Sequence, residues 1–242
     1  MSQIITPDTK ILTPEVEAQR AVKVHEFKKA IKALRYRVLG MAKAYELINE
    51  TKLAAEWYLV HDAIDFCLVH HTGWRKDNIT PSAMHQISLA NDAMTFVGGL
   101  MFPARTIIAT LLHDTPEDTP ISHAEVRDNF GSESEEDVEI LTKEYRGVKK
   151  DVAEYHREQA SNPVTSVVKP IDRKYNLKTM CGVFKMEKQV SYCDETERDY
   201  FDMMKISRRR FPRQELVYES LKLGLTTIIQ LYRAAHAKGI AL

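Results

Sequence analysis

The 242-residue sequence contains only three cysteines, and they lie far apart without a CxxC pair: Cys67, Cys181 and Cys193. An odd number of widely spaced thiols argues against a disulfide framework and against a thiolate zinc site. The sequence also lacks a charge excess, because 34 basic residues balance 34 acidic ones. Proteins that wrap nucleic acid through counterion release usually carry a large basic excess. We therefore expect reduced thiols in a cytoplasmic protein without a nucleic-acid partner.

Long hydrophobic runs are absent as well. No apolar run approaches the roughly 18 residues that cross a bilayer, and the opening MSQIITPDTK lacks the basic and apolar regions of a signal peptide. The chain is 44% hydrophobic and 28% charged, which is typical of a folded globule and excludes a mostly disordered class. We expect no membrane partner, whereas a local basic pocket for a small anion stays compatible with the neutral total.

Helical periodicity dominates the sequence. Thr13-Pro14-Glu15 is typical of a helix start, and apolar residues then recur at steps of three and four from Val24 to Ile48. Further helices are predicted over 52–71, 81–97, 102–114, 122–130, 132–145, 148–160, 163–180, 186–206 and 213–236. Capping boxes are predicted at Ser122–Glu125 and Ser132–Glu135. Without a period-two strand, the prediction is an all-α fold with a helical extension over 1–55 and the main domain over 56–242.

The strongest chemical signal lies at the end of an apolar helix. His113-Asp114 closes that helix, and Glu117-Asp118 follows almost at once. Four ionisable groups beside apolar residues are costly to desolvate unless something pairs them, and a divalent cation would do so. Pro116 ends the helix and leaves Thr115 to cap a new turn, which brings the four groups over one spot. The alternative is an exposed helix end with a solvated acidic turn.

Two other segments add candidate ligands. His85 lies on a predicted amphipathic helix after a loop that carries Arg75 and Lys76, although a lone helical histidine is more often structural. Asp172 and Asn176 are four residues apart on one predicted helix face, immediately after an apolar run. Two imidazoles and two carboxylates form a mixed nitrogen and oxygen set, which suits a six-coordinate ion such as Mn²⁺ better than a closed zinc site.

These segments resemble a known family when they are taken in order. The series HHTGWRKDNITPSAMHQ, LLHDTPEDT, DNFGSESEEDVEILTKEY and VKPIDRKYNLKTM is similar to the HD-type phosphohydrolases over about residues 65–210. Within them it resembles the alarmone hydrolases, which comprise the hydrolase domains of Rel/SpoT enzymes and the small alarmone hydrolases, including the metazoan SpoT homologue. The order HDxxEDT, FG, TK and DRxxN is far more specific than an isolated His-Asp pair.

The resemblance implies an all-α HD-domain bundle with one Mn²⁺ ion held by His85, His113, Asp114 and Asp172. It implies that Glu117 and Asp118 position or activate the attacking water. It also implies that the substrate is contacted by Arg75, Lys76, Lys143 and Asn176. The implied reaction removes the 3′-pyrophosphate of ppGpp or pppGpp, giving GDP or GTP and pyrophosphate.

Departures from the family pattern leave alternatives open. Gln86 follows the first histidine, and Ser82 stands where an aromatic residue is usual, so both departures lie around the nucleotide pocket. The same metal site could act on the 2′-phosphate of NADPH, on ppApp or on a dNTP. Another alternative is a non-catalytic nucleotide sensor that uses the N-terminal helix for assembly, and a homo-oligomer stays open.

Overall fold

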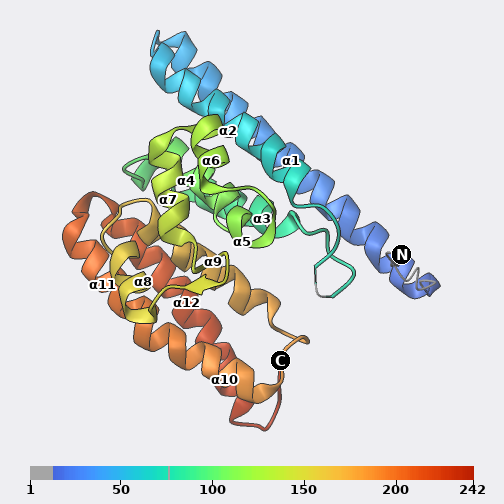
Figure 1. Ribbon diagram of the computed structural model, residues 1–242. Helices are drawn as coiled ribbons and strands as arrows, with labels where there is room; N and C mark the ends of the chain where they lie inside the picture. Colours follow the sequence, from blue (N-terminus) through green and yellow to red (C-terminus); the bar gives the residue numbers. More distant parts are fainter. Residues whose placement is uncertain (1–12, 76) are drawn as a thin grey trace, which may run out of the picture.

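The computed structural model describes residues 13–75 and 77–242, and over them the fold is all-α, as the sequence predicts (Figure 1). The helices are α1 (Pro14–Leu47), α2 (Thr51–His70), α3 (Met84–Ala93), α4 (Pro103–Leu112), α5 (Thr115–Asp118), α6 (His123–Phe130), α7 (Ser132–Leu141), α8 (Val152–Gln159), α9 (Thr165–Thr179), α10 (Met186–Glu195), α11 (Phe201–Arg210) and α12 (Glu215–His236). Shorter elements are η1 (Met94–Gly99), η2 (Thr196–Tyr200), η3 (Pro212–Gln214), β1 (Glu144–Tyr145) and β2 (Val148–Lys149).

The long N-terminal helix α1 lies along α2, to which a tight turn with Asn49 at a positive φ of 61° connects it (Figure 1). The predicted cap is confirmed, since the Thr13 hydroxyl accepts from the backbone N–H of Val16 and Pro14 opens the helix. Leu34, Val38 and Ala42 are buried in the C-terminal half of α1. That half is part of the hydrophobic core, whereas the N-terminal third is largely exposed.

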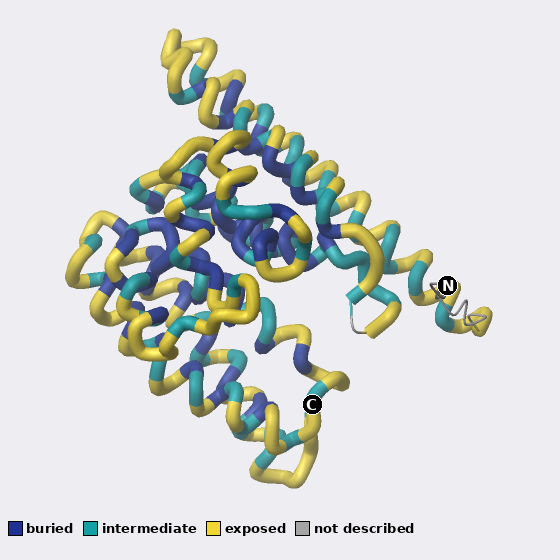
Figure 2. Tube along the Cα trace, in the orientation of Figure 1, coloured by how far each residue is buried: buried dark blue, intermediate teal, exposed yellow. Residues whose placement is uncertain are grey.

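Helix α4 runs through the centre of the molecule, where Figure 2 shows the buried chain. All of its residues except Pro103 and Arg105 are buried, and it packs against α2, α3, α7 and α9. Its two buried hydroxyls are satisfied within the helix, because Thr106 donates to the carbonyl of Phe102 and Thr110 to that of Thr106. A largely buried helix, packed on four others, therefore holds the His113-Asp114 pair in one place.

Arg105, the charged residue of α4, ties the neighbouring helices together. Its Nη2 donates to Oδ1 of the fully buried Asp137 on α7 at 2.8 Å, and Asn162 donates to the same oxygen at 2.8 Å. The buried carboxylate is thus hydrogen-bonded from both sides, as a charge in the interior requires. This connection fixes α7 and the turn before α9 relative to α4.

The segment between α6 and α8 differs from the prediction. The capping box at Ser122–Glu125 is confirmed, but the second one is wrong, since Ser132 is already helical and Gly131, with φ at 86°, occupies the cap position. The helix predicted over 132–145 ends earlier, at Leu141, and the helix predicted over 148–160 begins later, at Val152. A small antiparallel hairpin stands there, and its turn places Arg146 and Gly147 at positive φ, a conformation of two-residue hairpin turns.

The C-terminal half packs α12 against α9, and one predicted helix is divided. The region 186–206 comprises α10, the π-helical turn η2 and the start of α11 rather than one regular helix. Pro163 and Pro212 both lie in turns, as predicted. Within residues 13–75 and 77–242, no helix combines the length and hydropathy that crossing a bilayer requires.

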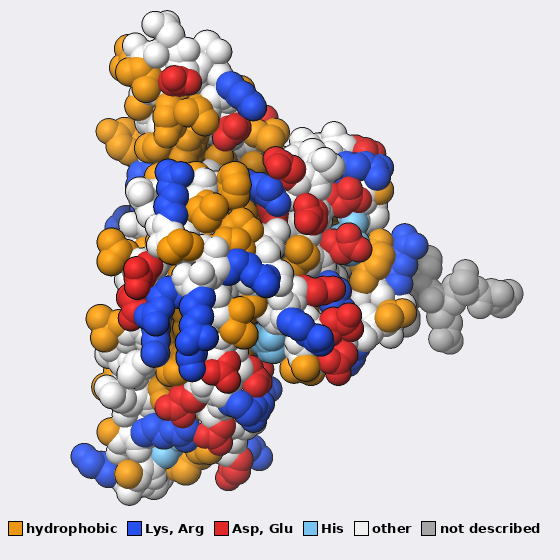
Figure 3. All heavy atoms as spheres, turned by 90° about the vertical axis from the view of Figure 1, so that its left-hand side faces the viewer, with side chains coloured by type: hydrophobic (Ala, Val, Ile, Leu, Met, Phe, Trp, Pro, Cys, Tyr) orange, Lys and Arg blue, Asp and Glu red, His pale blue; other side chains and the backbone are white. Residues whose placement is uncertain are grey.

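The surface of one face, shown in Figure 3, carries basic and acidic side chains that are interspersed rather than segregated. Apolar side chains gather toward the end where α1 turns into α2, and Leu47 and Ile48 are exposed there.

Candidate metal centre and substrate cavity

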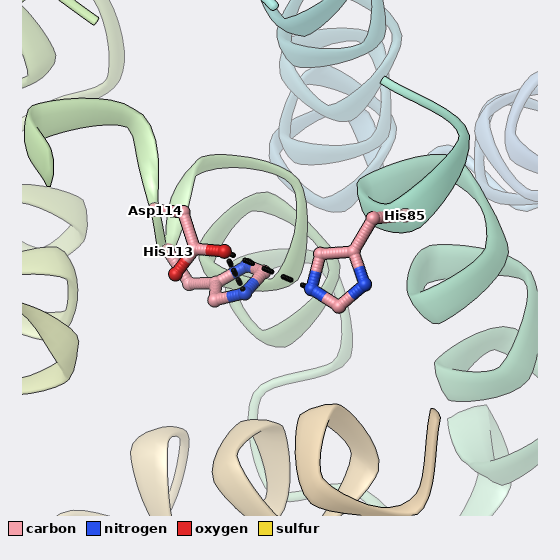
Figure 4. Close-up of side chains that lie close together, drawn as sticks. All are labelled: His85, His113 and Asp114. Atoms are coloured by element: carbon pink, nitrogen blue, oxygen red, sulfur yellow. Dashed lines mark ion pairs between the residues drawn. The ribbon is translucent and has the colours of Figure 1, made fainter. Parts of the chain in front are cut away.

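Four predicted ligands converge from three helices. His85 comes from α3, His113 and Asp114 from the end of α4, and Asp172 from α9. The Nε2 atom of His113 lies 2.9 Å from Oδ2 of Asp114 and 3.9 Å from Oδ1 of Asp172. The Nε2 atom of His85 lies 3.7 Å and 3.2 Å from the same two oxygens. Figure 4 shows three of these side chains pointing toward one another.

The end of α4 explains why His113 and Asp114 face inward. The Nδ1 atom of His113 lies 2.9 Å from the carbonyl oxygen of Thr110, so a proton on Nδ1 directs the Nε2 lone pair toward the carboxylates. Asp114 then leaves the helical conformation, and α5 starts with Thr115 and Pro116. The new turn exists as predicted, but Asp114 rather than Thr115 occupies its cap position.

His113 has an unsatisfied buried nitrogen that fits a metal ligand. Its side chain is 1% exposed, and among the described residues its Nε2 makes no hydrogen bond of acceptable geometry despite its proximity to Asp114. Burial lowers the pKa of His113, but the nearby charges of Asp114 and Asp172 outweigh this effect and raise the pKa to about 9. A positive charge is thus favoured at this point, either as a proton on His113 or as the divalent cation that this donor set would fit.

Asp172 is held in place by its neighbours on α9. Its Oδ2 lies 3.0 Å from Nζ of Lys169, one turn before, and its Oδ1 accepts a hydrogen bond of 2.7 Å from Nδ2 of Asn176, one turn after. Burial opposes ionisation, yet Lys169 and the two histidines keep the pKa of Asp172 well below its ordinary value. Asp172 and Asn176 therefore share one helix face, as their spacing predicts.

His85 and its surroundings complete the arrangement. Burial lowers the pKa of this imidazole, which keeps it neutral and able to donate a lone pair. The ring packs edge-on against Tyr175 at 5.0 Å and lies 5.3 Å from the ring of His113. Two neutral or neutralisable imidazoles and two carboxylates with fixed orientations are a donor set that fits a divalent first-row ion.

A cavity of about 650 Å³ opens above these residues. Six of the ten predicted site residues line it: Arg75, His85, Asp114, Asp118, Asp172 and Asn176. His113 lies beneath it in contact with Asp114. Lys76 lies outside the described residues, so its predicted role stays a prediction. The volume falls in the range of about 300–1,000 Å³ that small-molecule sites occupy.

Glu117 and Lys143 meet away from the lining of this cavity. An oxygen of Glu117 accepts backbone N–H groups from Lys143 and, at 3.3 Å, from Glu144 in β1. Burial raises the pKa of Glu117 above its ordinary value. Lys143 also borders a second cavity of about 480 Å³ between the hairpin and α10. The contact that Lys143 makes with the acidic pair is therefore a backbone one, to Glu117.

Three residues near the site were not singled out from the sequence. Lys169 lies three residues before Asp172 on the same helix face, so the i,i+3 spacing could have indicated it. Tyr175 packs on His85, and Lys23 of α1 lines the cavity. The last two depend on contacts between distant segments, which no local pattern in the sequence reveals.

The fold and this site agree with the resemblance that the motifs carry. A buried helix ends in a His-Asp pair that lies beside a second histidine and a distant aspartate, which is the set of side chains that the resemblance to the HD-type hydrolases implies.

Comparison with known proteins agrees with this class. No protein-family model matches the sequence. The chain is similar to the guanosine-3′,5′-bis(diphosphate) 3′-pyrophosphohydrolase of Aquifex aeolicus (strain VF5), with 31% identity over 146 residues. The match covers 58% of this chain and 20% of the relative, so the chain spans about a fifth of the length of that protein. The resemblance to the Rel/SpoT-type hydrolases is confirmed by this match.

Proposed function

We propose that this protein is a metal-dependent phosphohydrolase that removes the 3′-pyrophosphate of (p)ppGpp-like alarmones, giving GDP or GTP and pyrophosphate. The observation that carries the proposal is the grouping of His85, His113 and Asp114, which could hold a metal ion, with Asp172 beside them, at a cavity of small-molecule size. The Aquifex relative, whose name states this reaction, supports the choice of substrate.

His85, His113, Asp114 and Asp172 would hold one divalent ion, and their mixed nitrogen and oxygen donors favour Mn²⁺. When it is bound, such an ion lowers the pKa of a water molecule and withdraws charge from a phosphoryl oxygen. The residues around the four ligands keep them in position. Thr110 orients His113, and Asn176 and Lys169 orient Asp172.

The acidic pair of α5 would handle the proton of the attacking water. Asp118 lines the cavity, so its carboxylate would accept the proton of the attacking water. The bond that this water forms to phosphorus replaces the bond to the 3′ oxygen, which takes up a proton and leaves as the 3′ hydroxyl of GDP or GTP. Glu117 is anchored by the backbone of β1, and its burial raises its pKa. It would hold α5 at the correct distance and stabilise the position of Asp118.

Cationic and amide groups of the cavity would bind the nucleotide. Arg75 is the predicted phosphate ligand on the loop before α3, and a guanidinium can grip a phosphate with two parallel hydrogen bonds. Asn176 donates one N–H of its Nδ2 to Asp172, which leaves its carbonyl oxygen and its second N–H available to the substrate. The free thiols of Cys67, Cys181 and Cys193 support a reducing compartment, and we propose that the protein acts in the cytoplasm.

Incubation of metal-free protein with Mn²⁺ or Zn²⁺ and a nucleotide panel tests the proposal. The panel consists of ppGpp, pppGpp, ppApp, NADPH and a dNTP, with products separated by anion exchange. We expect Mn²⁺-dependent release of pyrophosphate from ppGpp and pppGpp. Orthophosphate from NADPH would instead assign a monoester substrate, and no turnover of any compound would refute the proposed activity.

A further inference from the structure

The N-terminal part of α1 reaches past the end of α2 and lies against the loop between α2 and α3, of which residues 71–75 and 77–83 are described (Figure 1). At 1.5 Å per residue, α1 is about 51 Å long and α2 about 30 Å, so roughly fourteen residues of α1 extend beyond its partner. Arg20 lies in this stretch. Its Nε donates to the carbonyl of Asn78 at 2.8 Å, and its Nη2 donates to Oδ1 of the same residue at 2.6 Å.

The loop that Arg20 grips is itself folded. The backbone N–H of Arg75 donates to the carbonyl of Thr80 at 2.8 Å, and Asp77 accepts two backbone hydrogen bonds across the turn. The guanidinium of Arg20 also lies 4.1 Å from the ring centroid of Trp74, within cation–π distance. Contacts on both sides of Arg75 therefore connect α1 to the loop that carries the predicted phosphate ligand.

Lys23 lies one turn after Arg20 on α1 and lines the same cavity as His85 and Asp172. Its side chain is 42% exposed, whereas those of His85 and Asp172 are 4% and 8% exposed. The metal-ligand residues thus form the floor of the cavity, and Lys23 stands at its mouth. A nucleotide whose scissile group lies beside His85 and Asp172 would extend from the floor toward the mouth, where Lys23 lies.

The charges of the cavity make this lysine significant. Among the described residues that line the cavity, Lys23 and Arg75 are the two lysine or arginine residues, whereas four aspartates contribute negative charge. Asp77 is satisfied by hydrogen bonds within its own loop, and two others belong to the metal centre. In the described structure Lys23 pairs with Glu26 at 2.8 Å, but that carboxylate is 46% exposed. Such a surface pair contributes little free energy, so a phosphate can displace it.

We propose that Lys23 binds a phosphate group of the substrate at the cavity mouth, on the side of the nucleotide remote from the scissile group. Arg20 acts as a positioning residue that fixes the loop bearing Arg75. The proposal rests on the proposed function, and it makes the N-terminal extension part of the substrate site. Nucleotides that carry phosphates at both ends are then the preferred ligands.

The matched pair Lys23→Ala and Lys32→Ala tests this assignment. Lys32 is exposed on the same helix, and nine residues at about 100° each place it on the opposite side from Lys23. Both variants are compared with the wild type on ppGpp and on a guanosine that carries only the 3′-diphosphate. Calorimetric titration with GDP, which lacks the scissile group, measures binding independently of turnover.

For Lys23→Ala we expect kcat/KM for ppGpp to fall about tenfold with little change in kcat, and the Kd for GDP to rise about tenfold, because one charge-assisted contact is lost. The substrate without 5′-phosphates should be unaffected, Lys32→Ala should match the wild type, and Lys23→Arg should retain most of the binding.

Equal losses on both substrates, or no loss on either, would overturn the role of Lys23 while leaving the proposed function intact. If no substrate is turned over but Lys23→Ala still selectively weakens GDP binding, the proposed function fails and the phosphate site stands. A wild-type protein that neither hydrolyses ppGpp nor binds GDP overturns both proposals.

Discussion

Replacing Asp172 with alanine should affect metal binding and stability through two separate interactions. The carboxylate is a proposed metal ligand, and it is also the ion-pair partner of Lys169, whose Nζ lies 3.0 Å from Oδ2. The side chain of Lys169 is only 14% exposed. Burial lowers the pKa of Lys169, but Tyr155 and Asp172 outweigh it and hold that pKa well above its ordinary value, so the ammonium stays charged.

The stability effect follows from that buried charge. Removing one partner of a buried ion pair costs about 3–5 kcal/mol, because the other charge is left uncompensated. For a chain of this length, 1 kcal/mol shifts Tm by roughly 2–4 °C. Metal-free Asp172→Ala should therefore unfold about 6–20 °C below the metal-free wild type. Loss of a ligand should also weaken Mn²⁺ binding by at least about 100-fold. That is the upper end of the loss seen when a residue that only orients a ligand is removed, and removing the ligand itself should cost no less.

A double-variant cycle separates the two effects. Lys169→Met removes the buried charge without removing a ligand, so it should still bind the metal, with an affinity lowered by no more than about 10–100-fold, the cost of losing an outer partner. Asp172→Ala combined with Lys169→Met should recover most of the lost Tm and still fail to bind Mn²⁺. Thermal unfolding in chelator and titration of Mn²⁺ give the two readouts. Wild-type Mn²⁺ affinity in Asp172→Ala would refute the ligand assignment, and an unchanged metal-free Tm would refute the account of Lys169.

Three further predictions concern other parts of the site. Asp118→Asn should keep most of the metal and lose on the order of 10²-fold in kcat, the usual size of an acid–base contribution. Glu117→Ala removes the oxygen that accepts the backbone N–H groups of Lys143 and Glu144, so it should also lower kcat while keeping most of the metal; wild-type turnover in both would show that the pair is only a solvated turn. Arg75→Ala should cost about 1.5–3 kcal/mol in kcat/KM with unchanged metal content, and Arg75→Lys should recover only part, whereas an unchanged kcat/KM would place the phosphate site elsewhere. Burial lowers the pKa of His71 from 6.5 to about 4, so the unfolded chain takes up a proton that the folded protein refuses. The free energy of unfolding should therefore fall by up to about 3 kcal/mol between pH 6.5 and 4. Chemical denaturation of metal-free protein at a series of pH values should show a weaker pH dependence of this free energy for His71→Gln than for the wild type; an identical pH dependence would contradict this account.

Much of the metal centre could be predicted because its elements are encoded locally. The His-Asp pair follows an apolar helix, the proline after it ends that helix, and the i,i+4 spacing of Asp172 and Asn176 places both on one face. Helix packing then brings these segments together, and the hydrophobic pattern already indicates which faces are buried. The assignments of individual catalytic and binding roles remain predictions.

What could not be predicted depends on contacts between segments. The hairpin after α7 is a case in point, because β1 is fixed by backbone groups that donate to Glu117, 26 residues earlier in the chain. Local propensity alone favoured a continued helix there. Ser132 has the sequence of a cap, yet Gly131 at positive φ lets α7 begin directly after α6. The contribution of Lys23 requires α1 to lie against a loop some fifty residues away, which periodicity cannot indicate.

Because α1 is one uninterrupted helix, the direction of a side chain at one of its contact points fixes the direction of a side chain at the other. Leu34 is buried in the core, and Arg20, fourteen residues earlier on the same helix, contacts the loop. At about 100° per residue, the side chains of Arg20 and Leu34 point to within about 40° of the same side of α1. Deleting a single residue between them would turn Arg20 by about 100° and draw it about 1.5 Å along the axis, away from Asn78. Removing seven residues would nearly preserve the direction but shorten the reach by about 10 Å. The spacing between these two anchors is therefore constrained in length as well as in phase, although most of the intervening side chains face solvent.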